Sequence, residues 1–158
     1  MRLTSYTDYA LRVLLFAGAA GETVTITKIS AAFGISKDHL RKVVHALSQE
    51  GYVSTSQGRN GGITLGMPAD QINLGEVVRH FETATLVECF NTETNTCPIL
   101  GMCGLKHVLF KAQKNFLDTL DQYHLSDIIK NPALVTFARL YQYPEPVRLV
   151  SAGMAADG

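Results

Sequence analysis

Three cysteines within one short stretch constrain the fold of this chain more than any other feature. Cys89 is followed by seven residues and Cys97, and then by five residues and Cys103. The segment between them is polar and turn-prone, and it has too few apolar side chains to pack into a core of its own. Three thiolates that converge from one loop are the ligands that an iron–sulfur cluster or a soft metal needs. The alternative is three unconnected buried cysteines, but core cysteines should scatter along the chain.

Length and composition indicate a globular protein. A chain of 158 residues fits one domain or two small ones. Its composition of 46% hydrophobic and 18% charged residues is typical of a soluble, folded protein. No apolar run approaches the ~20 residues of a membrane span, and the start shows no signal-peptide cleavage region. An odd cysteine count without an export signal favours a reducing compartment, so we expect a cytoplasmic protein.

The net charge of zero conceals an asymmetry between the two halves of the chain. Residues 1–66 carry seven basic and four acidic residues, a balance of +3, and residues 67–158 carry seven basic and ten acidic residues, a balance of −3. This distribution favours a polyanion-binding module joined to a sensing or assembly module.

The first 66 residues carry the pattern of a winged helix-turn-helix. We expect helices over 5–20, 26–33 and 37–49, with Ser5 and Asp8 spaced as a capping box at the start of the first. Strands over 52–56 and 63–65 follow, joined by a glycine-rich hairpin loop. This order predicts a mainly α (α+β) fold whose third helix enters the DNA major groove, and the alternative is another small α+β packing unit.

After Pro68, we expect a helix over 73–83, the cysteine loop, an amphipathic helix over 105–123 and a short helix over 125–129. The long helix is either a dimerisation helix or an internal core helix. Beyond Asn131 the chain has three prolines and a loose tail. The predicted domains are a winged helix-turn-helix over 1–68, a cluster loop with dimerisation helix over 69–130, and a partly disordered extension over 131–158.

Several segments together resemble the winged-helix iron–sulfur regulators that include NsrR, IscR and RirA. They are the start Met1–Ala10, the wing Gly58–Gly62 with Leu65-Gly66, and the cysteine loop with Gly104-Leu-Lys106. Thr4–Asp8 and Leu120–Ile128 are most similar to the nitric-oxide-sensing NsrR repressors. The seven-residue cysteine gap and Val87–Phe90 also resemble the iron-responsive RirA regulators.

The resemblance implies a homodimeric repressor that reads a palindromic operator. It also implies one cluster per subunit on Cys89, Cys97 and Cys103, favoured as 4Fe–4S with 2Fe–2S as the alternative. Cluster loss or nitrosylation would change DNA affinity. The fourth ligand is either Asp8, offered by the partner subunit as in NsrR-like proteins, or His107, which lies one place later than the IscR-like histidine. We favour Asp8.

Candidate DNA contacts lie at the start of the third helix, on the wing and at the start of the first helix. Basic side chains at the start of the third helix could contact guanine bases or phosphates. The alternative is a solvated charged face, and for Lys42 the two interpretations are equally supported. Arg59 is placed for a minor groove, and the first helix offers hydroxyls for phosphate near its N-terminus. The full set is Ser36, Lys37, His39, Arg41, Lys42, Arg59, Asn60, Thr4, Ser5 and Thr7.

No Ser-His-Asp set, phosphate-binding glycine loop or acid pair suggests an enzyme of hydrolysis or group transfer. The resemblance therefore favours a homodimeric iron–sulfur repressor that binds operator DNA and is released when nitric oxide attacks its cluster. Three alternatives to this function remain. They are an iron- or cluster-status regulator, a small iron–sulfur redox protein, and a thiol sensor without metal.

Overall fold

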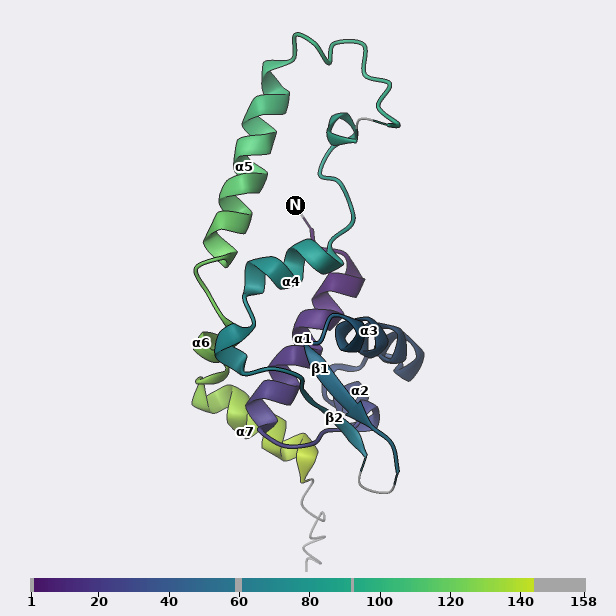
Figure 1. Ribbon diagram of the computed structural model, residues 1–158, viewed down its shortest axis with the longest axis vertical. Helices are drawn as coiled ribbons and strands as arrows, with labels where there is room; N and C mark the ends of the chain where they lie inside the picture. Colours follow the sequence, from purple (N-terminus) through teal and green to yellow (C-terminus); the bar gives the residue numbers. More distant parts are fainter. Residues whose placement is uncertain (1, 59–60, 92, 144–158) are drawn as a thin grey trace, which may run out of the picture.

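Helix α1 (Ser5–Ala20) runs through the centre of the main body of the computed structural model, and helices from both halves of the chain pack against it (Figure 1). The structure describes residues 2–58, 61–91 and 93–143. Thr4 has an extended backbone and caps α1, accepting a hydrogen bond from the Thr7 amide at 3.3 Å. The predicted capping box of Ser5 and Asp8 is therefore wrong, because Thr4 supplies the cap and Ser5 already lies inside the helix.

The winged helix-turn-helix is present in the predicted order. Helices α2 (Ile26–Phe33) and α3 (Lys37–Gln49) are joined by a tight turn in which Gly34 adopts φ +66°. Strands β1 (Val53–Ser56) and β2 (Gly62–Leu65) then pair antiparallel as the wing, with Val53 opposite Leu65. Each strand differs from its predicted range by one residue at its start.

The core lies between α1 and the elements that surround it. Val13, Leu14 and Phe16 of α1 are fully buried, as are the residues that α3 turns inward. Those residues are Leu40, Val43 and Leu47, at the helical spacing that the sequence predicted. Burial of this apolar stripe leaves the opposite face of α3 in solvent.

The second half comprises the 3-10 turn η1 (Ala69–Gln71), α4 (Leu74–Phe81), the 3-10 turn η2 (Glu88–Phe90), α5 (Gly104–Leu120) and α6 (Leu125–Ile129). Helices α4 and α5 are both shorter than predicted. Asn73 is the cap of α4 rather than part of it. Helix α5 ends at Leu120 because the backbone beyond it turns to pair with the start of α4, where Leu74 N donates to Tyr123 O at 3.0 Å.

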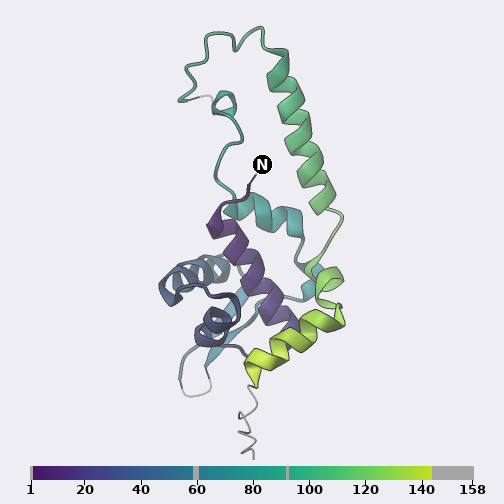
Figure 2. The same ribbon diagram turned by 180° about the vertical axis from the view of Figure 1, so that it is seen from behind.

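Helix α5 stands apart from the rest of the molecule, as both views show (Figures 1 and 2). None of its residues is buried, and it packs mainly against α4. The side chains of Leu105, Val108 and Phe110 are each at least 60% exposed. The alternative prediction of an internal core helix is therefore wrong for the chain as described.

Helix α7 (Pro132–Gln142) was not predicted, and it packs against α1 and α2. Phe137 lies 6.4 Å from Phe16 and 5.6 Å from Phe33, measured between ring centroids. The first part of the predicted extension is therefore a helix on the core, and the predicted loose tail over 144–158 lies outside the described residues. Among the described residues, no helix is long and apolar enough to cross a membrane.

Candidate nucleic-acid interface and metal centre

The exposed face of α3 carries the basic residues that the sequence singled out. The side chains at this face are Lys37, His39, Arg41 and Lys42. Ser36 is also exposed, but its hydroxyl caps α3 by accepting from the His39 amide at 3.3 Å. Arg41 pairs with Asp38 one turn earlier, so Lys37 and Lys42 are the cations on this face without an ion-pair partner among the described residues.

A hollow of about 250 Å³ lies between the start of α1 and this face of α3. Tyr6 reaches across it and donates to the Lys42 carbonyl at 3.4 Å, and the Tyr9 ring lies 6.3 Å from the His39 ring. Ser5 lines the same hollow. The start of α1 and the start of α3 therefore form one surface. The sequence analysis missed both tyrosines, although their spacing of three residues on a predicted helix places them on one side.

Thr4 and Thr7 are engaged inside the protein by a carboxylate that the sequence analysis also missed. Glu82 Oε2 accepts from the Thr4 amide at 2.7 Å and from the Thr7 hydroxyl at 2.9 Å. Thr7 is fully buried, which leaves it no surface to offer a phosphate. Glu82 lies at the end of α4, where the segment that leads to the cysteine loop begins, so it joins that segment to the start of α1. No local signal marks it, because its partners are more than 70 residues away.

The predicted wing contacts Arg59 and Asn60 lie outside the described residues. Beside them, Gly58 adopts φ +104°, a conformation that favours glycine, and its carbonyl accepts from the Gly61 amide at 3.0 Å.

The three cysteines are free and half-buried in the segment from η2 to the start of α5. Glu88 Oε1 accepts from the Thr96 amide at 2.9 Å and from the Thr96 hydroxyl at 2.8 Å. These hydrogen bonds lower the pKa of Glu88. Because Glu88 precedes Cys89 and Thr96 precedes Cys97, the contact brings the neighbours of two cysteines together. Cys103 is the residue before the first turn of α5.

The two candidates for a fourth ligand lie on different helices. Asp8 forms an ion pair with Arg12 one turn later, at 2.8 Å, and His107 is exposed one turn into α5. Within residues 2–58, 61–91 and 93–143, no three His, Cys, Asp or Glu side chains lie close enough together to hold a metal ion. The described conformation thus brings the three cysteines into one segment without gathering them around a centre.

The residues of this segment fit an iron–sulfur cluster by their chemistry. Three unpaired thiols are the soft donors that such a cluster requires, and none is committed to a disulfide or buried in the core. No described residue of this polar loop is buried, so the loop can close around a group without disrupting the core.

Comparison with known proteins decides the family. Residues 3–131 match the Rrf2 family, described as "Iron-dependent Transcriptional regulator". The chain belongs to the Rrf2 family. The match covers the winged helix, the cysteine loop, α5 and α6, and it stops at the start of α7. Rrf2 membership also confirms the prediction that the chain is not an enzyme, because the family consists of transcriptional regulators.

Curated relatives within the Rrf2 family confirm the resemblance to NsrR. The chain is 54% identical to the HTH-type transcriptional regulator NsrR of Bacillus licheniformis over 134 residues, which cover 83% of this chain and 94% of that protein. It is 52% identical to NsrR of Bacillus subtilis, with 83% and 92% of the two chains covered.

Solved structures of Rrf2-type regulators share the fold. T. potens IscR matches with a TM-score of 0.66 at 21% identity, over 83% of this chain and 88% of that one. The oxidized form of Staphylococcus aureus CymR matches with a TM-score of 0.65 at 21% identity, over 82% and 96%. These matches confirm the predicted mainly helical winged-helix fold.

Proposed function

We propose that the protein is a homodimeric DNA-binding repressor that holds an iron–sulfur cluster and leaves its operator when nitric oxide reacts with that cluster. One observation carries the proposal. A winged helix with a basic α3 face and a loop with three free thiols occur in one chain that is about half identical to regulators named NsrR.

On the DNA side, α3 enters the major groove with Lys37, His39 and Lys42 toward the duplex. Their exposure and the burial of the opposite apolar stripe support this orientation. Ser5 and Tyr6 border the same surface and contact the phosphate backbone there. Arg59 and Asn60 on the wing reach the adjacent minor groove.

The dimer forms through α5. A helix of 17 residues with none buried, and with Leu105, Val108 and Phe110 exposed, has an apolar surface that the single chain does not cover. A second copy with the same surface covers it in a closed two-fold pair. The resulting dimer presents two α3 helices to a palindromic site.

Cys89, Cys97 and Cys103 hold the cluster, favoured as 4Fe–4S with 2Fe–2S as the alternative. Asp8 of the partner subunit completes the ligand set, with His107 as the alternative. When bound, the cluster supplies iron that reacts with nitric oxide. An oxygen or imidazole ligand would bind iron less firmly than a thiolate, which would leave that iron more accessible to a small molecule. In the single chain Asp8 is held by Arg12, and it must exchange that partner for the metal.

Glu82 passes the state of the loop to the DNA-binding surface. It caps the end of α4 next to the loop, and it holds the Thr4 amide and the Thr7 hydroxyl at the start of α1. A change in the conformation of the loop would move Glu82. Because Glu82 holds the start of α1, Ser5 and Tyr6 would then move relative to α3.

The test is anaerobic purification, followed by stepwise addition of nitric oxide while the visible spectrum and operator binding are recorded together. We expect a coloured dimer that releases its operator as the spectrum changes. Cys97→Ala should lose both colour and operator binding. Thr94→Ala, a change at an exposed position of the same loop, should keep both. Colourless wild-type protein, or tight cluster-dependent binding in Cys97→Ala, would contradict the proposal.

A second candidate function is an iron- or cluster-status regulator, and the family description "Iron-dependent Transcriptional regulator" favours it. Iron chelation in parallel with the nitric oxide titration separates the two. Release of the operator at a lower dose of chelator than of nitric oxide would favour the iron-status regulator.

A further inference from the structure

Helix α5 is an arm that is fastened to the winged-helix body at one end. It is 17 residues long, or about 25 Å at the usual rise per residue, and none of its residues is buried. Its first residues follow the cysteine loop, and its last residues meet the start of α4 (Figures 1 and 2). The direction of the arm therefore depends on the contacts at its C-terminal end.

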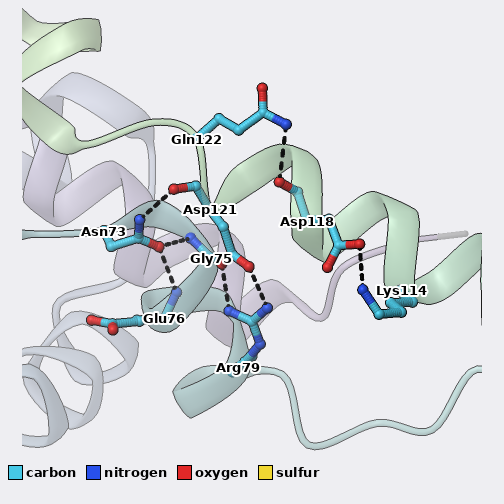
Figure 3. Close-up of polar contacts among 8 residues, drawn as sticks. All are labelled: Asn73, Gly75, Glu76, Arg79, Lys114, Asp118, Asp121 and Gln122. Atoms are coloured by element: carbon cyan, nitrogen blue, oxygen red, sulfur yellow. Dashed lines mark hydrogen bonds and ion pairs between the residues drawn. The ribbon is translucent and has the colours of Figure 1, made fainter.

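One of these contacts is a bidentate ion pair between α4 and the end of α5 (Figure 3). Arg79 Nη1 lies 2.5 Å from Asp121 Oδ1, and Nη2 lies 2.7 Å from Oδ2. A planar guanidinium that binds both oxygens of a carboxylate fixes orientation as well as distance. Asp121 is the residue that ends α5, so this pair fixes the end of the arm against α4.

Asn73 ties the same point to the backbone. Its side-chain Nδ2 donates to the Asp121 carbonyl at 2.7 Å, while its Oδ1 accepts from the amides of Gly75 and Glu76 at 2.9 and 3.1 Å. One side chain thus caps the start of α4 and holds the end of α5 (Figure 3).

Gly75 completes the site by leaving room for the carboxylate. It is buried in the first turn of α4, and a Cβ atom at this position would overlap Asp121 Oδ1. Gly75 and Arg79 are four residues apart and so lie on one side of the helix. We call Asn73, Gly75, Arg79 and Asp121 the α4–α5 joint.

We propose that the α4–α5 joint determines which half-site spacing the repressor reads, by fixing the angle between the dimerisation arm and the winged helix. This inference rests on the proposed function, because it requires a dimer through α5 that binds two half-sites. A rotation of about 10° at the joint moves the far end of a 25 Å arm by about 4 Å, which exceeds the 3.4 Å rise of one base pair. Asp121 and Arg79 are thus positioning residues, distant from the DNA contacts.

The experiment compares Asp121→Asn with Asp118→Asn. Asp118 lies one turn earlier on the same helix and pairs with Lys114 of α5 itself at 2.6 Å (Figure 3). Both changes remove one negative charge, but only Asp121→Asn weakens a contact between α5 and the body. The probe is a palindromic duplex selected from random DNA by the wild-type protein, together with versions that have one or two base pairs added or removed at the centre.

We expect the wild type and Asp118→Asn to prefer the selected spacing equally. In Asp121→Asn the ratio of affinities for selected and altered spacing should fall about threefold to tenfold, within the range known for changes in coupling elements. Arg79→Lys keeps the positive charge but cannot bind both carboxylate oxygens of Asp121 at once, so it should also lower the ratio of affinities. Sedimentation and circular dichroism check that each variant is folded and dimeric, and Arg79→Lys decides the matter if Asp121→Asn does not fold.

Folded, dimeric Asp121→Asn and Arg79→Lys proteins with the spacing ratio of Asp118→Asn would overturn the inference while leaving the proposed function intact. Wild-type protein that selects no palindrome would overturn the proposed function, and with it the role of the joint.

Discussion

Glu88 takes part in a contact that links the chain next to Cys89 with the chain next to Cys97. Its carboxylate receives two hydrogen bonds from Thr96, and each of these residues directly precedes a cysteine. In the proposed cluster site, this contact would keep Cys89 and Cys97 close to each other in the chain without metal.

We expect Glu88→Ala to lose its cluster more readily than the wild type. Removing the carboxylate frees both ends of the loop, and residues that orient ligands typically change metal affinity by about tenfold or more. Iron release to a chelator, followed by the visible spectrum under anaerobic conditions, measures the effect. Glu93→Ala, at an exposed glutamate of the same loop, is the control and should behave like the wild type. Equal release rates in the two variants would show that the Glu88–Thr96 contact is unimportant for metal binding.

Asp121 should titrate below its ordinary range. The hydrogen bonds from the Arg79 side chain are the main cause that lowers the pKa of this carboxyl from its usual 3.8. Because the folded pKa is lower than the unfolded one, the contribution of the ion pair is fully present above about pH 4 and disappears as the pH falls through the folded value. Carboxyl chemical shifts from pH 2 to 7 measure it, and in Arg79→Gln the pKa of Asp121 should return toward 3.8. An unchanged pKa in that variant would assign the shift to another cause.

At the scale of elements, a substitution of Arg59 tests whether the wing contacts DNA. We expect Arg59→Ala to weaken operator binding by about 1–3 kcal/mol, on the scale of one lost specific contact. Gel shifts at matched salt measure this loss. The control is Gln57→Ala, at an exposed position two residues earlier on the same loop. An affinity equal to that of the control would remove Arg59 from the interface.

Helix α5 makes a separate prediction about assembly. Val108→Glu places a charge in the exposed apolar surface, so we expect a monomer by sedimentation and loss of operator binding, because one winged helix reaches only one half-site. Lys111→Glu changes the charge of an already polar position on the same helix and should stay dimeric. A dimeric Val108→Glu protein would place the interface elsewhere.

The sequence predicted those elements whose signals are local. Thr25, Ser36 and Gly34 mark the ends of α2 and α3 by short-range capping and turn chemistry, and both helices have the predicted bounds. The predicted end of α5 at residue 123 was wrong, because Tyr123 pairs through its backbone with Leu74, nearly 50 residues away, and this pairing ends the helix earlier. Glu82 and the Arg79–Asp121 pair have no local pattern, since each depends on partners brought together only by folding.

At the scale of the whole molecule, α7 shows how tertiary packing forms a helix that the sequence pattern did not predict. Phe137 contacts rings from α1 and α2, and Gln142 donates to the Thr23 carbonyl at 2.7 Å. These contacts connect the C-terminal part of the described chain to the turn before α2. The first part of the extension that was predicted to be partly disordered therefore packs on the helix-turn-helix.

We expect Phe137→Ala to reduce the free energy of unfolding by about 2–3 kcal/mol, less than for a fully buried phenylalanine because Phe137 is half-buried. Urea unfolding measures it. Leu140→Ala, at a position of α7 that is 61% exposed, should change the stability by less than about 0.5 kcal/mol. Equal stability of both variants would mean that α7 does not support the core.

The glycine in the first turn of α4 has a consequence for how this protein unfolds. Glycine inside a helix costs about 0.5–1 kcal/mol relative to alanine, and a helix of eight residues is too short to persist alone in water. Gly75 thus lowers the intrinsic helix stability of α4, but it leaves the space that the Asp121 carboxylate, 46 positions further along the chain, occupies. The helix depends on that aspartate in return, so α4 and the end of α5 should melt as a single cooperative unit.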